Sequence, residues 1–264
     1  MDTILFAGGD RRTLVAIDYM KRAEYSVKTY AVTDRFPFDG SGISAMVLPF
    51  PCVKRGTLNA PMIETPPTLS ELIRETGIDK NIPVIGGPIP ENPFPHFIDL
   101  STREDLKLRN AVTTVEGAVK LLIQYTDHAI FGSRSLVVGY GAIGKRLAKI
   151  LSAMGSAVTV AARKEKDRVD GELQGFSAIH TVAMDLAEFD LVINTVPAPL
   201  LGESVVSTAP PHTLFLELAS APGGISRGDP RRNILDGPAL PGKVAPVTAG
   251  EDLAKTVISI LKNL

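Results

Sequence analysis

The 264-residue sequence predicts an α/β protein built from two doubly wound domains. Apolar, β-branched runs typical of buried strands alternate with segments of helical spacing along the chain. Glycine clusters directly follow two of these runs, at Gly8-Gly9 and at residues 139–144, as expected where a strand turns into a helix. The length suffices for two modest cores, and 44% hydrophobic with 22% charged residues is an ordinary globular composition.

The first domain is predicted to span residues 1–112. Its first strand enters the turn Gly8-Gly9-Asp10, and the residues that follow have the apolar spacing of a helix. A later helix is expected at the capping box formed by Thr68 and Glu71. The strands of this domain are predicted at residues 4–7, 26–33, 45–50 and 82–85. A proline-rich loop at 88–95 follows them.

The second domain is predicted over residues 113–247. Thr113 and Glu116 have capping-box spacing, which predicts a linker helix over 113–127. The following elements are a strand at 135–139, a helix at 142–154, and strands at 157–162, 178–182, 190–195 and 213–219. A last helix, predicted over 248–264 from the spacing of Thr248 and Glu251, is expected to return to the first domain.

The turn after the first strand of this second domain has the spacing of a dinucleotide-binding fingerprint. Strand residues 136–138 lead into Gly139-Tyr140-Gly141-Ala142-Ile143-Gly144, and an amphipathic helix begins there. In a G-x-G-x-x-G turn the first glycine permits the tight turn, and the second lets the backbone approach a pyrophosphate. The third allows close helix–strand packing. The helix N-terminus then offers free N–H groups to the phosphates. The second domain is therefore predicted to be a Rossmann domain.

The residues after its second strand favour NADP over NAD. NAD-specific sites place an acidic residue at the end of that strand, where it binds the ribose 2′-hydroxyl. Here Arg163 and Lys164 follow the strand instead. Both side chains pair well with a 2′-phosphate, and an arginine also stacks on adenine. A charged surface loop is the alternative interpretation, and it would leave NAD as the cofactor.

Two further loops are expected to border the nicotinamide end, because ligands of such sheets bind at the carboxyl ends of the strands. The first of these loops is Asn194-Thr195-Val196-Pro197, and the second contains Ala219 and Ser220. The side chains of Asn194 and Thr195 are candidates for hydrogen bonds to ribose or carboxamide. Ordinary turn chemistry explains either loop equally well.

Charge, cysteine content and hydropathy restrict the protein class. A net charge of −1 gives no reason to expect nucleic acid or an anionic membrane as partner. The single cysteine, Cys52, excludes an internal disulfide and a cysteine-based zinc cluster, and no metal site is expected. The sequence contains neither a secretory signal pattern nor an apolar run that could cross a bilayer, so a cytoplasmic protein is predicted.

Several motifs besides the fingerprint recur together in one family. They are Gly8-Gly9-Asp10-Arg11-Arg12, Thr114-Val115-Glu116-Gly117, Gln124-Tyr125-Thr126-Asp127, the loop 194–197, the run 218–224, and the ending 240–246 with Thr248-Ala249-Gly250. On these residues the chain resembles the A subunits of dipicolinate synthase, the enzyme that makes the spore metabolite pyridine-2,6-dicarboxylate. It departs from the family after Gly224, where Ile225-Ser226-Arg227 stands in place of Thr-Asp-Phe. No expectation is therefore transferred to residues 225–236.

The resemblance implies a dehydrogenase subunit. Its reaction would be the oxidation of dihydrodipicolinate, or of the hydrated tetrahydro form, to dipicolinate with a nicotinamide cofactor. It further implies a flavoprotein-like partner, the B subunit of dipicolinate synthase, and a location in the mother cell of a sporulating bacterium. We also expect a homo-oligomer.

A dicarboxylate substrate requires positively charged or N–H donor groups, and bidentate arginine fits best. Arg12 is the first candidate, because it lies in the first turn after the glycine loop. Asp10 is a candidate for orienting Arg12 or accepting a proton, and the N-cap of the helix is its other interpretation. Lys243 is the third candidate, with a solvated loop lysine as the alternative. The sequence identifies no catalytic base, since capping explains Glu116 fully.

Two other functions stay open. A 2-hydroxyacid-type dehydrogenase has a similar layout, but it needs an arginine and a histidine–carboxylate pair in the cofactor domain. The chain has Ala-Ser-Ala-Pro-Gly-Gly at 219–224 instead, and no histidine follows His212. A non-catalytic nucleotide-binding scaffold for a flavoprotein partner is compatible with the sequence, because no base is identified.

Overall fold

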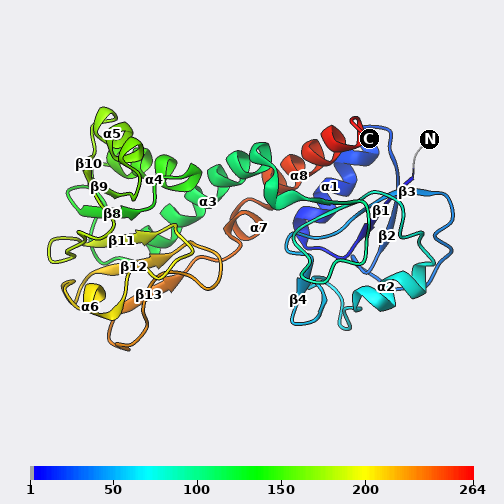
Figure 1. Ribbon diagram of the computed structural model, residues 1–264, viewed down its shortest axis with the longest axis horizontal. Helices are drawn as coiled ribbons and strands as arrows, with labels where there is room; N and C mark the ends of the chain where they lie inside the picture. The colour runs from blue at the N-terminus through cyan, green and yellow to red at the C-terminus, as the bar shows by residue number, and fades with distance from the viewer. Residues whose placement is uncertain (1–2) are drawn as a thin grey trace. The chain divides into compact units, whose positions relative to one another are not determined.

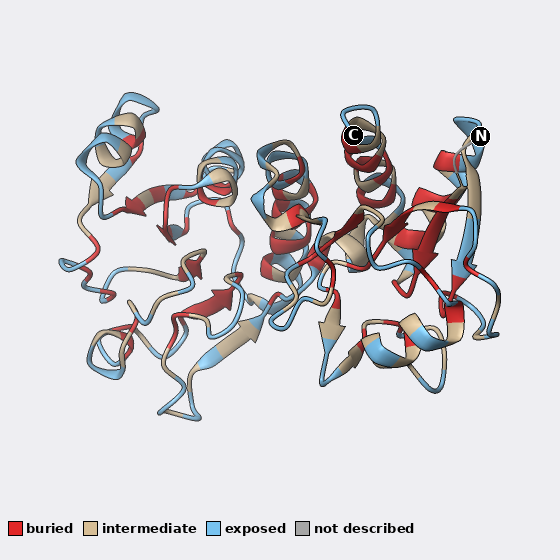
Figure 2. Ribbon diagram, turned by 45° about the vertical axis from the view of Figure 1, so that its right-hand side comes forward, coloured by how far each residue is buried: buried red, intermediate tan, exposed pale blue. Residues whose placement is uncertain are grey.

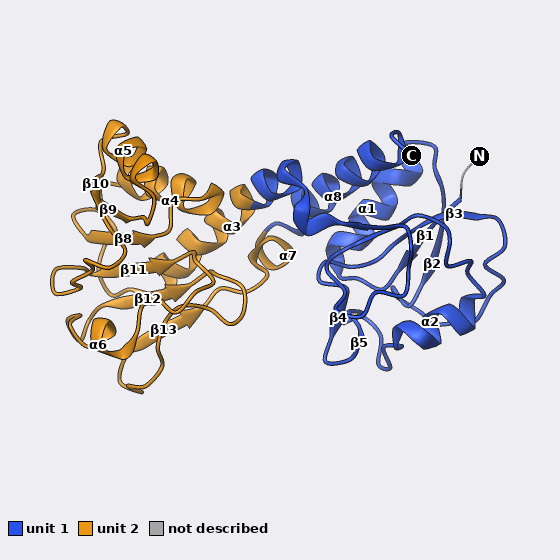
Figure 3. Cartoon of the chain, in the orientation of Figure 1, with its two compact units in different colours: residues 1–110, 245–264 blue, residues 111–244 orange. Residues whose placement is uncertain are grey.

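A computed structural model describes residues 3–264, and the chain divides into two compact units (Figures 1 and 3). Unit 1 comprises residues 1–110 and 245–264, and unit 2 comprises residues 111–244. Each unit contains one main parallel sheet with helices packed on it. The predicted fold class, two doubly wound α/β domains of which the second is a Rossmann domain, is confirmed.

Unit 1 is organised around a five-stranded parallel sheet in the order β2-β1-β3-β6-β7. Numbered within the unit, this is the order 2-1-3-4-5, which reverses between β1 and β3. Ligands of such sheets bind beyond the carboxyl ends of the strands at this reversal. The strands are β1 (Thr3–Ala7), β2 (Ser26–Tyr30), β3 (Ile43–Val47), β6 (Val84–Gly86) and β7 (Phe97–Asp99), and a small hairpin is formed by β4 (Val53–Lys54) and β5 (Thr57–Leu58).

The helices of unit 1 begin at clear capping residues. The Asp10 side chain caps α1 (Arg11–Arg22), and Thr68 with Glu71 forms the capping box of α2 (Leu69–Thr76). The C-terminal helix α8 (Pro246–Leu261) lies in unit 1 beside α1 (Figure 1). Gly250 makes this approach close, because a β carbon there would meet the Arg12 carbonyl oxygen and the Val15 side chain. The short 3₁₀ helix η1 (Leu100–Thr102) follows β7.

Unit 2 contains a six-stranded parallel sheet in the order β10-β9-β8-β11-β12-β13. Within the unit this is the order 3-2-1-4-5-6 of dinucleotide-binding domains, with its reversal between β8 and β11. The strands are β8 (Arg134–Val138), β9 (Ala157–Ala161), β10 (Ser177–Ile179), β11 (Leu191–Asn194), β12 (Leu214–Glu217) and β13 (Asn233–Asp236). The helices are α3 (Glu104–Tyr125), which begins in unit 1, α4 (Ala142–Ala153), α5 (Glu165–Leu173), α6 (Glu203–Val206) and α7 (Leu240–Val244).

The sheet of unit 2 is covered on both faces, and its central strands β8, β11 and β12 are buried, whereas the edge strands β10 and β13 are partly exposed (Figure 2). Val137 packs into the cluster that includes Leu147 and Leu151 of α4, whereas Leu136 and Val138 belong to the cluster on the opposite face. Successive strand residues alternate between the two faces, so both sets must be apolar. This explains the unbroken apolar run that precedes the fingerprint.

Two predicted helix starts are wrong. The linker helix begins at Glu104 instead of residue 113 and ends at Tyr125, because acidic residues in its first turn suit the helix dipole and nothing up to Thr113 breaks the helix. Thr113 and Glu116 therefore lie inside α3 and do not form a capping box. The last helix starts at Pro246, two residues before Thr248, and proline is favoured at a first helical position. The short strands β7 and β13 were not predicted either.

None of the helices in residues 3–264 is long and apolar enough to span a membrane. Across the same residues, His, Cys, Asp and Glu side chains nowhere gather in a group of three or more that could hold a metal ion.

Candidate functional site

The fingerprint loop connects β8 to α4 beside the reversal of the unit 2 sheet, and its three glycines differ in their surroundings. Gly139 has a φ of +97°, and a β carbon on it would collide with Thr195 Oγ1. A β carbon on Gly144 would collide with the Gly139 carbonyl oxygen. A β carbon on Gly141, in contrast, would have no atom within 4 Å. The first and third glycines thus serve the turn and the packing, and the second leaves open space beside the backbone, as a bound pyrophosphate requires.

The N-terminus of α4 is free to bind an anion. Gly141 is its N-cap, and no side chain caps this end. The side chains of Asp10 and Thr68, in contrast, cap α1 and α2. The first N–H groups of a helix have no partner within it, and the dipole is positive there. The turn formed by Ala142 and Ile143 therefore fits the phosphates of a dinucleotide.

Tyr140, the second residue of the fingerprint, packs inside unit 2. Its side chain is buried, and the Lys145 ammonium lies 5.0 Å from the centre of its ring. Lys145 Nζ donates to Asp170 Oδ2 of α5 at 2.6 Å. Burial is the main cause that raises the pKa of Tyr140. These contacts hold α4 against α5, so Tyr140 can contact a ligand through its backbone only.

Arg163 and Lys164 lie directly after β9, as predicted. Both are exposed, and their side chains make no hydrogen bond or ion pair with the part of the chain that the structure describes. The backbone beneath them is held by Arg168, a residue that was not predicted from the sequence. Arg168 Nη1 donates to the carbonyl oxygens of Ala162 at 3.0 Å and Arg163 at 2.8 Å. The strand end therefore carries basic side chains and no acidic residue at the position where NAD-specific sites have one.

The side chains of Asn194 and Thr195 form hydrogen bonds within the protein, which matches the alternative of ordinary turn chemistry. Asn194 is fully buried, and its Nδ2 donates to the Val196 carbonyl oxygen at 2.9 Å and to Glu217 Oε1 at 2.8 Å. Its Oδ1 accepts from the Val196 N–H at 3.1 Å. Thr195 Oγ1 donates to the Val138 carbonyl oxygen at 2.9 Å. At a strand end, short polar side chains form hydrogen bonds with backbone groups that no longer pair with a neighbouring strand.

Glu217, the last residue of β12, connects the two loops. It is 7% exposed, and besides Asn194 it accepts from the N–H groups of Ala219 at 3.0 Å, Gly224 at 2.7 Å and Ile225 at 3.1 Å. Glu217 was not among the residues predicted from the sequence. An acidic residue closing an apolar strand was the available signal, because a buried carboxylate needs several hydrogen-bond donors.

The other predicted residues of the loops after β11 and β12 are at least partly accessible to solvent. Pro197 and Ser220 are exposed, and Val196 and Ala219 are half-buried. The Ser220 hydroxyl makes no hydrogen bond to any residue in 3–264. This leaves Ser220 as the predicted side-chain donor that these loops keep free for a ligand.

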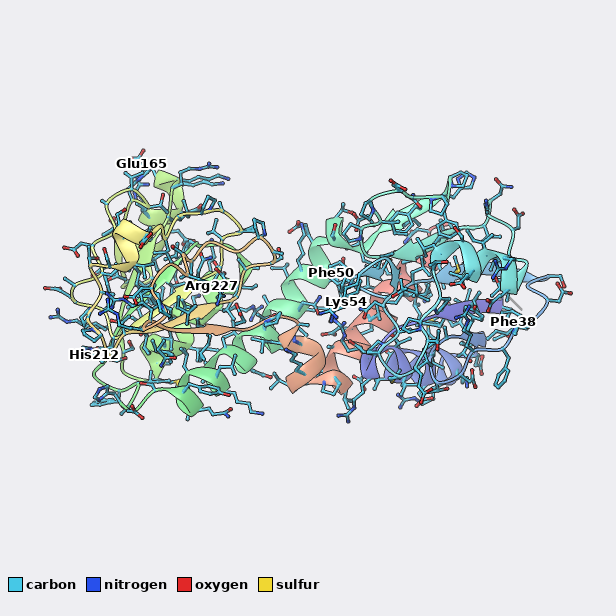
Figure 4. The ribbon with its side chains drawn as sticks, turned by 90° about the horizontal axis from the view of Figure 1, so that it is seen from below. Phe38, Phe50, Lys54, Glu165, His212 and Arg227 are labelled. Carbon is cyan, nitrogen blue, oxygen red and sulfur yellow. The ribbon has the colours of Figure 1, made fainter. Side chains whose placement is uncertain are left out.

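In unit 1 the loops after β1 and β3 meet at the reversal of the sheet. Arg12 Nε and Nη2 donate to the Asp10 carboxylate at 3.0 and 2.8 Å, and Nη2 also donates to the Phe50 carbonyl oxygen at 3.0 Å (Phe50 is labelled in Figure 4). Burial opposes ionisation of Asp10, but the hydrogen bonds and charge of Arg12 prevail and lower its pKa. Arg12 thus ties the two loops together and keeps Nη1 without a partner among the described residues.

A small cavity lies beside this pair. The residues that line it are Gly9, Asp10, Arg12, Thr13, Pro49, Phe50, Asn59, Leu106, Asn110, Ala249 and Leu253. Side chains fill the space beside the glycine turn of unit 1, since β carbons on Gly8 and Gly9 would collide with Leu58 and Thr13 respectively. The turn therefore does not form a second phosphate loop like the one at Gly141.

Lys243 lies in α7 of unit 2, whereas Asp10 and Arg12 belong to unit 1. Its side chain is exposed and forms no ion pair within residues 3–264, which matches the alternative of a solvated lysine. The three predicted substrate residues are therefore not brought together within either unit.

Comparisons with known proteins agree with this geometry. The family model "D-isomer specific 2-hydroxyacid dehydrogenase, NAD binding domain" matches residues 109–219. The A subunit of dipicolinate synthase from Bacillus subtilis (strain 168) is 37% identical over 173 residues, which is 64% of this chain and 58% of that protein. The aligned part thus spans less than two thirds of the length of this relative.

Solved structures extend the similarity to nearly the whole chain. The structure of the Bacillus subtilis A subunit superposes with a TM-score of 0.85 at 27% identity, covering 99% of this chain and 96% of that one. The A subunit from Bacillus halodurans gives 0.86 at 27%, covering 98% and 97%. A transhydrogenase from Sinorhizobium meliloti, with a TM-score of 0.70 at 14% identity over 98% and 93%, shares the fold.

The predicted resemblance is confirmed in sequence and in fold, and the matched domain supports a nicotinamide dinucleotide as the ligand of unit 2. An oxidoreductase of dehydrogenase type is the coarse assignment that these matches support. By sequence and by fold, the chain is similar to the dipicolinate synthase A subunits, and its residues 109–219 match the NAD-binding domain of D-isomer specific 2-hydroxyacid dehydrogenases.

Proposed function

We propose that the protein is the dehydrogenase subunit of a dipicolinate-forming enzyme. It would oxidise dihydrodipicolinate, or the hydrated tetrahydro form after loss of water, to dipicolinate. The observation that carries this function is the open face at Gly141 beside the sheet reversal, in a chain 37% identical to a dipicolinate synthase A subunit over its aligned part.

The ring becomes aromatic by losing one hydride and one proton. A bound oxidised nicotinamide supplies the hydride acceptor. The residues of this chain bind and orient the reactants: the loop 139–144 holds the pyrophosphate, and the loops 194–197 and 219–224 border the nicotinamide end. In unit 1, Arg12 Nη1 has no partner among residues 3–264, and this donor would bind a substrate carboxylate.

The cofactor of this reaction is NADP in our proposal. Arg163 and Lys164 are exposed just after β9, where a 2′-phosphate would lie, and neither side chain is paired with a residue in 3–264. Two phosphate–cation pairs favour NADP, and the strand end has no carboxylate that would favour the 2′-hydroxyl of NAD.

We propose three further features. A flavoprotein-like B subunit of dipicolinate synthase is the proposed partner, a homo-oligomer is the proposed assembly, and the mother cell of a sporulating bacterium is the proposed location. The partner is supported by the similarity to proteins described as A subunits of dipicolinate synthase.

A coupled assay tests the reaction. The ring precursor is generated in situ with dihydrodipicolinate synthase, and dipicolinate and reduced nicotinamide are both recorded after addition of this protein with NADP or NAD. We expect both products in equal amounts. Dipicolinate formed only with the B subunit, and without reduced nicotinamide, would favour the non-catalytic scaffold. Turnover of a 2-hydroxy acid, with none of the ring compound, would contradict the proposed substrate.

Replacing Arg12 tests the substrate site. Arg12→Ala is expected to raise the KM for the ring substrate by about tenfold or to abolish turnover, because a charged hydrogen bond to a carboxylate is lost. Cofactor affinity should not change, since Arg12 belongs to unit 1. Arg11→Ala is the control, because Arg11 is the exposed neighbour. Kinetics of Arg12→Ala equal to those of the control would remove Arg12 from the site.

A further inference from the structure

We propose that Arg168 of α5 determines the preference for a 2′-phosphate at the nucleotide site. It would hold the end of β9 in place and present its remaining N–H groups to the phosphate. Because its role concerns the 2′-phosphate, this inference rests on the proposed use of NADP.

Arg168 is fixed by the chain itself. Its Nη1 bridges two consecutive carbonyl oxygens, those of Ala162 at 3.0 Å and Arg163 at 2.8 Å. These carbonyls lie between the end of β9 at Ala161 and the start of α5 at Glu165. The two bonds use both hydrogens of one terminal nitrogen. The guanidinium is therefore held beside the strand end without any ligand.

The rest of the guanidinium has no partner. Nε and Nη2 make no hydrogen bond, and Arg168 forms no ion pair, with any residue of the described chain. Of the acidic residues on α5, Asp170 is paired with Lys145, and Glu165, Asp167 and Glu172 form no hydrogen bond or ion pair with Arg168. Nε and Nη2 form the edge of the guanidinium that binds two oxygens of a phosphate in parallel. A charged fork thus remains available at this place.

The end of β9 is the position at which a binding site distinguishes NADP from NAD. In a sheet of order 3-2-1-4-5-6, the end of the second strand lies at the ribose of the adenosine half, and β9 is that strand. Helix α5 begins at the same loop, and no side chain caps its N-terminus. The first turn of α5 also carries the acidic Glu165 and Asp167, so we expect a 2′-phosphate to be bound by the Arg168 fork and not by the helix dipole.

The anchoring makes Arg168 a stronger contributor than its exposed neighbours. Arg163 and Lys164 must each order a long, exposed side chain when they bind a phosphate, and this costs conformational entropy. The two carbonyl bonds have already ordered much of Arg168. Its contacts should therefore account for most of the discrimination between a 2′-phosphate and a 2′-hydroxyl.

The test compares two ligands that differ only in this group, adenosine 2′,5′-bisphosphate and adenosine 5′-monophosphate, by calorimetric titration of the full chain. The wild type should bind the bisphosphate more tightly. Arg168→Gln should weaken bisphosphate binding by about tenfold or more, because a hydrogen-bonded charge is lost, and should change monophosphate binding less than twofold. Arg168→Lys should recover part of the loss, since it keeps the charge but not the fork.

Lys166→Gln is the control for a general loss of charge, because Lys166 is exposed on the same turn. Its effect should stay below about threefold, as a single exposed charge is screened by salt. A full preference retained in Arg168→Gln would overturn the role of Arg168 and leave NADP as the cofactor. Equal weakening of both ligands would reduce Arg168 to a structural residue. A wild type without preference would contradict both this inference and the proposed cofactor.

Discussion

Gly141→Ala is expected to preserve the fold and to weaken nicotinamide dinucleotide binding by about tenfold or more, which corresponds to about 1.4 kcal/mol. The added methyl group meets no protein atom within 4 Å, and the φ of −83° at Gly141 suits any residue. Thermal unfolding should therefore shift little. The methyl group would occupy the space that a pyrophosphate needs beside the backbone. Calorimetric titration with the dinucleotide and a thermal melt measure the two effects.

Gly144→Ala is the matched control, since it adds the same methyl group three residues later. There the β carbon would collide with the Gly139 carbonyl oxygen, so α4 must move away from β8. We expect a loss of stability of about 1–3 kcal/mol together with lost binding. If Gly141→Ala binds the dinucleotide as the wild type does, or loses as much stability as Gly144→Ala, the open face is not a ligand site.

Glu217→Ala is expected to destabilise unit 2 by about 3 kcal/mol or more. The carboxylate accepts four hydrogen bonds, three from backbone N–H groups and one from Asn194, and its removal leaves these donors unsatisfied. A buried donor without a partner costs about 1–3 kcal/mol. Denaturant unfolding measures the stability, and limited proteolysis should detect loosening at residues 219–225.

Glu188→Ala provides the comparison for this loss. Glu188 is 75% exposed and pairs with Arg134 at the surface of the same unit, so its removal should cost less than about 1 kcal/mol. Equal stability of the two variants would show that the loops after β11 and β12 hold together without Glu217.

The fold class and the nucleotide loop could be predicted because their signals are local. A strand buried on both faces is an unbroken apolar run, and the glycines at 139–144 follow it directly. The caps of α1 and α2 were predicted correctly for the same reason, since Asp10 and Thr68 lie within three residues of the N–H groups that they bind.

The contacts that the sequence did not reveal join partners that lie far apart in the chain. The sequence around Asn194 fits a ligand contact and a loop-stabilising residue equally well, and its hydrogen-bond partner Glu217 comes 23 residues later. The Phe50 carbonyl oxygen that accepts a hydrogen bond from Arg12 Nη2 is likewise 38 residues away. The helix start predicted at Thr113 and Glu116 is wrong for another reason. Capping-box spacing also occurs inside helices, and only the conformation of the preceding residues tells the two apart.

The central claim is that unit 2 binds NADP through the loop 139–144 and the basic end of β9. Titrating the wild-type protein with NADP⁺ and NAD⁺ in parallel, at two salt concentrations, tests it most directly. We expect NADP⁺ to bind at least about tenfold more tightly, since two or more charged hydrogen bonds reach the 2′-phosphate, and the preference to shrink at high salt. Equal binding of the two cofactors, or tighter binding of NAD⁺, would contradict the claim.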